Sequence, residues 1–152
     1  MRKIQRSVLA LFAALAATAC VALVSASPAQ AAGGCWGSGG AHTDYIGNTY
    51  GTRYCNAYTG GYVMNGGSVA GYLNAGNSWF VCQEDFGSDY PNPQVGSAVN
   101  TYWLYTQADT GSAPLHGWGW FPATMISGGN NNGPIPYLHS CDDYPVWLFP
   151  TP

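Results

Sequence analysis

The chain of 152 residues is 47% hydrophobic and only 7% charged, with four basic and seven acidic side chains. Three of the basic residues lie within the first six positions. The rest of the chain therefore has one basic residue, Arg53, and seven acidic residues. A surface of this kind cannot release counterions from a nucleic acid or bind an anionic membrane, so we expect neither nucleic acid nor membrane as a partner of the mature protein.

Residues 1–31 are predicted to be a secretory signal peptide. A basic start is followed by an apolar run from Val8 to Val24, and Ala29-Gln30-Ala31 is a small-x-small cleavage site. We therefore expect an extracellular protein. A membrane anchor is one alternative, but the apolar run is marginal in length for a span and no positive cluster follows it. A lipoprotein with a lipidated Cys20 is the other alternative.

The mature chain holds an even number of cysteines, which in a small exported domain predicts two disulfides. The four residues are Cys35, Cys55, Cys82 and Cys141. Of the three pairings we favour Cys55–Cys82, because Cys82 ends a clear strand, together with Cys35–Cys141, which would join the two irregular ends. A structural zinc site is the alternative, but the chain has no CxxC pair. We expect no bound metal and no cofactor.

Short alternating runs along the mature chain predict β-strands, and no window outside the leader has sustained helical periodicity. After an irregular Gly-rich segment at 32–47, the expected strands cover residues 49–58, 62–64, 68–73, 79–83, 101–107 and 117–122. Residues 74–77 are predicted to be a hairpin connection, residues 108–115 a loop, and residues 122–124 a single helical turn. The length allows one domain, and the fold class is all-β.

The last part of the chain, residues 128–152, is a tail rich in Gly, Asn and Pro. It ends in an apolar, proline-framed segment at 144–150 that includes Trp147. One interpretation is that this segment packs back on the strands. The other is that it docks on a second protein, in which case the chain would be an adaptor of an extracellular assembly or an inhibitor of a secreted hydrolase.

Four short motifs between residues 66 and 126 resemble the SH3-like barrels of secreted bacterial proteins, often called bacterial SH3 domains. They are the run Val69-Ala70-Gly71-Tyr72-Leu73-Asn74-Ala75-Gly76, the strand at 79–83, Tyr102-Trp103-Leu104, and Gly119-Trp120-Phe121-Pro122. The resemblance implies a small SH3-like β-barrel over residues 32–127, with disulfide-stapled irregular extensions at both ends.

The resemblance also implies a ligand groove. Tyr102 and Pro122 would line it, while Trp103 and Phe121 would lie on the opposite, core-facing side. Met125 stands where eukaryotic SH3 domains place a groove tyrosine, so recognition of PxxP peptides is not expected. Bacterial members commonly bind peptidoglycan or its cross-bridge peptides, and some support a neighbouring domain.

The aromatic residues are too numerous for the core of so small a domain. Six Trp and eleven Tyr are present, and none of them precedes residue 32. We expect Trp79 or Phe80, Trp103 and Phe121 in the core. An exposed platform would then bind a cell-wall polymer or peptide, because flat rings with polar tips bind sugars and peptides at low entropic cost. The predicted binding residues are Tyr102, Tyr105, Trp118, Trp120 and Pro122.

Catalytic patterns are absent from the sequence, so we expect a binding module and not an enzyme. The run His139-Ser140-Cys141 contains catalytic residue types, but neighbours on an extended chain point in opposite directions, and no GxSxG motif is present. Glu84, Asp85 and Asp89 do not have EF-hand spacing and are interpreted as a solvated acidic loop. Arg53 is expected to pair with a nearby acid.

Overall fold

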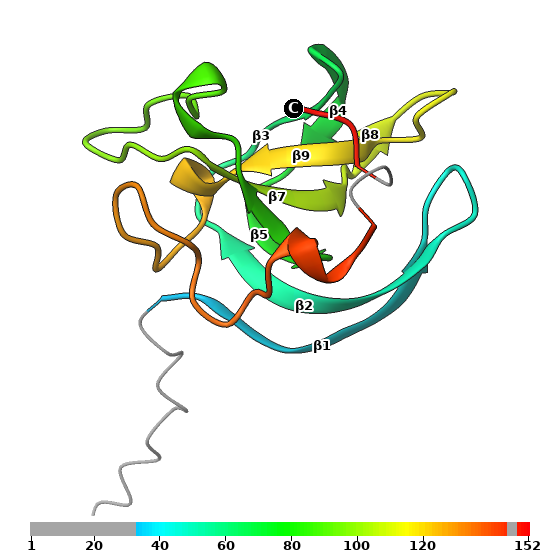
Figure 1. Ribbon diagram of the computed structural model, residues 1–152, viewed down its shortest axis with the longest axis horizontal. Helices are drawn as coiled ribbons and strands as arrows, with labels where there is room; N and C mark the ends of the chain where they lie inside the picture. The colour runs from blue at the N-terminus through cyan, green and yellow to red at the C-terminus, as the bar shows by residue number, and fades with distance from the viewer. Residues whose placement is uncertain (1–32, 146–148) are drawn as a thin grey trace, which may run out of the picture.

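The computed structural model describes residues 33–145 and 149–152. The predicted signal peptide and Trp147 therefore lie outside the described residues. The described chain is all-β, as predicted: nine strands form two sheets, and the helical turns are three short 3-10 segments, η1 (Gly87–Asp89), η2 (Ala123–Met125) and η3 (Cys141–Asp143) (Figure 1). Within these ranges no helix has the length and apolarity that a bilayer span needs.

The first sheet has the order β1-β2-β5 and consists of β1 (Cys35–Thr43), β2 (Thr49–Ala57) and β5 (Gly76–Phe80), all antiparallel. The irregular segment predicted at 32–47 is wrong, because most of it forms β1. Glycine weakens a strand, but this one is held by its pairing with β2 from Thr49 to Cys55, and the two strands run side by side as the long lower ribbons of Figure 1. The strand predicted at 49–58 is confirmed as β2.

The second sheet has the order β6-β7-β9-β3-β4-β8. Its strands are β3 (Gly61–Asn65), β4 (Ser68–Leu73), β6 (Gln83–Asp85), β7 (Tyr102–Gln107), β8 (Thr110–Gly111) and β9 (Trp118–Pro122). The strands predicted near 62–64, 68–73, 101–107 and 117–122 are confirmed, and the helical turn after Pro122 is confirmed as η2. Neither sheet closes on itself within the described chain, because β6 and β8 end the second sheet as separate edges.

The hairpin predicted at 74–77 is wrong. Leu73 ends β4, which pairs with β3 and β8, whereas Gly76 begins β5, which pairs with β2 in the other sheet. The strand predicted at 79–83 is likewise divided between the sheets, since β5 ends at Phe80 and β6 begins at Gln83. Between them, Val81 N–H donates to the Tyr105 carbonyl at 2.8 Å and Tyr105 N–H donates to the Cys82 carbonyl at 2.9 Å. These two bonds to β7 fix the segment through which the chain passes from the first sheet to the second.

Two buried clusters lie on opposite faces of the strands β7 and β9. The first cluster lies between the sheets and contains Phe80, Leu104 and Phe121. The second contains most of the buried aromatic rings: Tyr50, Trp103, Tyr105, Trp118 and Trp120. Because successive side chains of a strand point to opposite faces, β7 and β9 supply both clusters. The predicted burial of Phe80, Trp103 and Phe121 is confirmed.

The C-terminal segment covers the second cluster. The Trp120 indole Nε1–H donates to the Pro150 carbonyl oxygen, and the Phe149 ring lies 4.6 Å from the Tyr105 ring, centroid to centroid. The chain end then pairs with the β3–β4 turn, where Gly66 N–H donates to the Thr151 carbonyl at 2.8 Å. The described part of the tail therefore packs back on the strands, which confirms the first of the two interpretations.

The buried Gln83 side chain attaches the preceding part of the tail. Its amide Nε2–H₂ group donates to the Ile135 and Leu138 carbonyl oxygens, and its Oε1 accepts the Ile135 N–H. Both Ile135 and Leu138 are buried in the first cluster. A single glutamine thus satisfies three backbone groups that burial would otherwise leave without partners.

The prediction of two disulfides is confirmed, but the favoured pairing is wrong. The bonds join Cys35 to Cys55 and Cys82 to Cys141. Cys35 lies directly opposite Cys55 in the β1–β2 register, with 4.2 Å between their Cα atoms. Cys141 follows Ser140, which bridges to Gln83, the residue after Cys82. The register that places these pairs together is a long-range property that cysteine spacing does not contain.

Opening the second disulfide should release the cover of the aromatic cluster. The chain-entropy account gives about 4 kcal/mol for a loop of its 59-residue separation and about 3 kcal/mol for the 20-residue loop of Cys35–Cys55. We expect Cys82→Ala/Cys141→Ala to lower the free energy of urea unfolding and to shift the folded-state tryptophan emission to the red. The matched control, Cys35→Ala/Cys55→Ala, should lose stability with unchanged emission, and a red shift in the control alone would contradict this arrangement.

Two buried tyrosines of the second cluster should respond in opposite ways to loss of the hydroxyl. Tyr50 OH donates to the Asp44 carboxylate at 2.8 Å, and burial, with that carboxylate, raises the pKa of Tyr50. Tyr105 OH is buried without a hydrogen-bond partner in the described chain, and burial raises its pKa also. In urea unfolding, Tyr50→Phe should cost about 2 kcal/mol, and Tyr105→Phe should be neutral or stabilise by about 1 kcal/mol. Equal losses for both variants would contradict this difference.

Candidate functional site

Four of the five binding residues predicted from the sequence are buried, and three of these are rings of the second cluster. Tyr105, Trp118 and Trp120 are each at most 1% exposed. The prediction that their rings form an exposed platform is therefore wrong. Phe149 of the C-terminal segment and Phe86 cover Tyr105 and Trp120, and Tyr50 and Trp79 of the first sheet pack against Trp118. The apolar composition of residues 144–150 was the signal in the sequence that such a cover exists.

The other two predicted residues do not form an open groove together. Pro122 is buried and lies directly opposite Trp103 in the β7–β9 register, so the two share one face of the sheet. Tyr102 is half-buried and packs against the first cluster, on the face that holds Phe121. The prediction that placed Trp103 and Phe121 together on one core-facing side is wrong, because the register puts Phe121 opposite Leu104 and not opposite Trp103.

The exposed aromatic surface lies instead on the three-stranded sheet. Trp36 on β1 pairs with Tyr54 on β2, and Tyr54 pairs with Trp79 on β5. Cross-strand partners point to the same face, so one ring from each strand lies in a single row across the sheet. We call these three residues the aromatic row. The neighbouring pairs Cys35–Cys55 and Arg53–Phe80 point to the opposite face, toward the first cluster.

The geometry of the aromatic row suits a flat ligand. Trp36 and Tyr54 are each 37% exposed, and their ring planes are inclined by only 31° at a centroid distance of 6.5 Å. Trp79 is half-buried and stacks on the His42 imidazole at 3.7 Å and 14°, while its other neighbour is Trp118 at 5.3 Å. Trp79 therefore connects the exposed row to the covered aromatic cluster and fixes the inner end of the row.

A bulge in β1 flanks the row. Three residues, Gly37 to Gly39, face the single residue Arg53 between two regular pairs of the ladder. Gly39 lies so close to the sheet that a Cβ atom would approach Thr52 Oγ1 to 2.5 Å and Trp79 Cβ to 2.8 Å. The His42 Nε2–H donates to the Gly39 carbonyl at 3.0 Å and Thr52 Oγ1–H donates to the Gly40 carbonyl at 3.1 Å. Bulges of this kind re-aim side chains beside functional surfaces.

Neutral polar groups continue the same face beyond the row. Asn56 follows Tyr54 by two residues on β2, and its Nδ2–H₂ group donates to Asn77 Oδ1 at 2.9 Å. Ser127 Oγ–H in turn donates to Asn56 Oδ1 at 2.9 Å. Among the described residues, this face between Trp36 and Ser127 carries no Asp, Glu, Lys or Arg side chain, since Arg53 points to the first cluster with its Nε buried and unpaired. The surface favours neutral hydroxyl-rich or amide-rich ligands.

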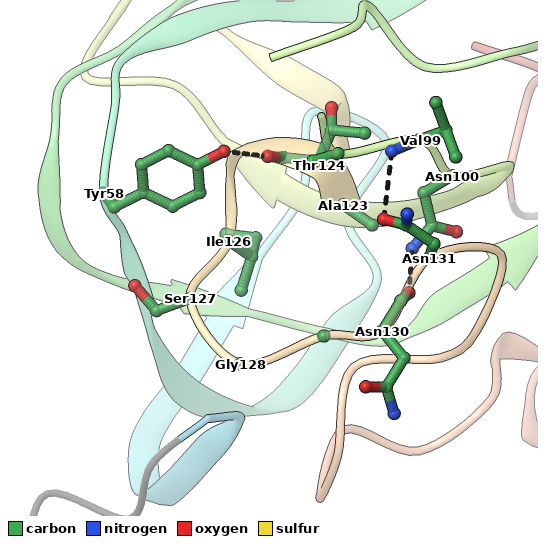
Figure 2. Close-up of a pocket in the computed structure, with 12 residues that line it drawn as sticks. Tyr58, Val99, Asn100, Ala123, Thr124, Ile126, Ser127, Gly128, Asn130 and Asn131 are labelled. Carbon is green, nitrogen blue, oxygen red and sulfur yellow. Dashed lines mark hydrogen bonds between the residues drawn. The ribbon is translucent and has the colours of Figure 1, made fainter. Parts of the chain in front are cut away.

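A pocket adjoins this polar end (Figure 2). It has a volume of about 390 Å³, and Figure 2 shows Tyr58 and Ser127 on one side of it and Val99, Asn100 and Asn131 on the other. Thr124 and Ile126 line the part between these two sides. Sequence reasoning missed this pocket, because its walls come from segments about 70 residues apart.

A second pair of exposed rings lies on β3 and β4 of the six-stranded sheet. Tyr62 on β3 and Tyr72 on β4 are 60% and 40% exposed and are cross-strand partners. Their planes meet at 81°, however, so one ring presents its edge to the face of the other. An edge-to-face pair offers no continuous flat surface, and this pair serves as a natural comparison for the aromatic row.

The residue types that suggested catalysis have structural roles. Cys141 is oxidised, and Ser140 accepts the Asp142 N–H as the cap of η3. No group of three metal-ligating side chains gathers in the described ranges.

In the acidic loop, Asp85 Oδ1 accepts the Gly87 N–H. Burial, with the negative charges of Asp142 and Asp85, raises the pKa of Glu84.

Comparison of the chain with protein-family models, with curated proteins and with solved structures found no match. The assignment of a function therefore depends on the geometry of the described residues.

Gly39 should be essential for the shape of the aromatic row. We expect Gly39→Ala to displace the bulge from Thr52 and Trp79, which should lower the free energy of unfolding by about 1–3 kcal/mol, as overpacking does, and change the near-UV circular dichroism of the tryptophans. Gly51→Ala on β2 is the matched control, because a Cβ there meets no atom within 4 Å. Equal effects of the two substitutions would show that the bulge does not pack on the row.

Proposed function

We propose that this protein is a secreted, non-catalytic binding module of SH3-like type that binds a neutral cell-wall polymer through the aromatic row. The observation that carries the proposal is the alignment of Trp36, Tyr54 and Trp79 in one register row. The Trp36 and Tyr54 rings are exposed, whereas the described tail covers the same face only farther along β2, at Tyr50. The two disulfides are consistent with an extracellular protein. The SH3-like assignment is supported by the short sequence motifs and by the all-β fold.

The chemistry of the row favours a carbohydrate over a charged ligand. The C–H face of a pyranose ring is apolar and slightly positive, and it packs on the negative face of an aromatic ring. Trp36 and Tyr54 present such faces at an inclination of 31°, and their rigid side chains lose little entropy when they bind. Asn56 and Asn77 supply amide groups, and the exposed bulge supplies backbone groups, for hydrogen bonds to sugar hydroxyls.

A sedimentation assay with purified peptidoglycan tests the proposal. We expect the mature protein to be retained, and Trp36→Ala/Tyr54→Ala to weaken retention by at least about tenfold, as the loss of about 1.4 kcal/mol implies. Both rings are partly exposed, so the double variant should remain folded, and its urea unfolding checks this.

Tyr62→Ala/Tyr72→Ala provides the matched control, because it also removes two exposed cross-strand rings. This variant should sediment with peptidoglycan to the same extent as the unchanged protein. Loss of retention in the control variant, or unchanged retention after removal of Trp36 and Tyr54, would reject the aromatic row as the binding surface.

A further inference from the structure

We propose that the pocket beside the aromatic row is a second subsite, which takes the acetamido group of an N-acetylated sugar. This inference rests on the proposed function and specifies its ligand. The sugar ring would pack on the row while its neutral amide substituent enters the pocket. The ligand class is therefore an N-acetylhexosamine polymer and not an unsubstituted glucan.

The row and the pocket are parts of one surface. Asn56 follows Tyr54 on the same face of β2, about 7 Å along the strand. Its amide accepts the hydroxyl of Ser127, and its backbone carbonyl accepts the Ser127 N–H at 2.8 Å. Ser127 lines the pocket together with Tyr58, the second residue after Asn56. A ligand that lies on Tyr54 and extends along β2 therefore reaches the pocket within about one sugar length.

The pocket has the lining of a site for a neutral group, and its volume leaves room for part of the sugar ring beside the acetamido group. Its volume of about 390 Å³ is near the lower end of the range for ligand pockets. Its apolar wall contains Ala98, Val99, Ala123 and Ile126, and its polar wall contains hydroxyl and amide groups, without a carboxylate or a cation. A methyl group with an adjacent amide satisfies both walls, whereas a carboxylate would be desolvated without a partner.

Hydrogen bonds fix the pocket wall in advance. The buried Asn100 donates its amide to the Asn130 and Gly133 carbonyl oxygens and accepts the N–H groups of Thr101 and Tyr102. Asn132 N–H also donates to the Val99 carbonyl at 3.0 Å. These bonds hold the 130–133 loop against Val99, so the ligand need not order it. The hydrogen bonds of Asn130 use its backbone carbonyl, and its exposed side-chain amide stays available to a ligand.

Backbone-amide NMR with monosaccharides tests the subsite directly. We expect N-acetylglucosamine, and not glucose, to shift the amide signals of residues 98–100 and 128–131. Val99→Trp should fill the pocket and weaken this response by at least about tenfold. Val69→Trp is the matched control, because Val69 is a similarly exposed valine on β4 and should leave the response unchanged.

Three results would overturn the subsite: equal shifts with both sugars, no shifts in these segments with N-acetylglucosamine, or an undiminished response in Val99→Trp. Tighter binding of the peptide probe N-acetylalanine methylamide than of N-acetylglucosamine would overturn the assignment to a sugar.

The same titration in Trp36→Ala/Tyr54→Ala separates this inference from the proposed function. There the pocket signals should still respond to N-acetylglucosamine, while chitotriose should lose its advantage over the monosaccharide. Pocket shifts without peptidoglycan retention would refute the proposed function alone. Peptidoglycan retention without pocket shifts would refute the subsite alone.

Discussion

The structure depends on one constraint: the central strands carry bulky apolar side chains on both faces, so both faces need a cover. β7 presents Leu104 to one side and Tyr105 to the other, and β9 does the same with Phe121 and Trp120. The first sheet covers one face, and the C-terminal segment covers the other together with Tyr50 of β2 and Trp79 of β5. The Cys82–Cys141 disulfide ties the start of that segment to the strands, and the Gln83 hydrogen bonds hold the part of the tail just before it, at Ile135 and Leu138.

The proposed binding surface begins where this cover ends. Trp79 touches Trp118 in the covered cluster and shares a register row with Tyr54 and Trp36, which are exposed. The aromatic face thus continues from the interior onto the surface, and the interior part gives the exposed part a rigid support. Rigid, preorganised rings lose less entropy when a ligand binds, so the packed core would also support the proposed binding face.

Most strands could be predicted from the sequence, because alternation is a local signal that β4, β7 and β9 display clearly. β1 could not be, since glycine has low strand propensity and this strand is held by its partner. The predicted exposure of Trp118 and Trp120 was wrong for a different reason. Alternation shows to which side of a strand a side chain points, but it does not show whether another segment covers that side. The alternation of Tyr50, Thr52 and Tyr54 on β2 already indicated an aromatic face on that strand, but its partner Trp36 depends on a register that local sequence does not contain.

The most direct test of the account is the response of the tryptophan indole N–H signals to soluble peptidoglycan fragments in NMR. We predict that the Trp36 signal shifts on binding, while the signals of Trp103 and Trp120, whose indole N–H groups donate to the Tyr90 and Pro150 carbonyl oxygens, stay in place. A shift of the Trp120 signal with an unchanged Trp36 signal would contradict it, because the ligand would then be binding under the C-terminal cover and not on the aromatic row.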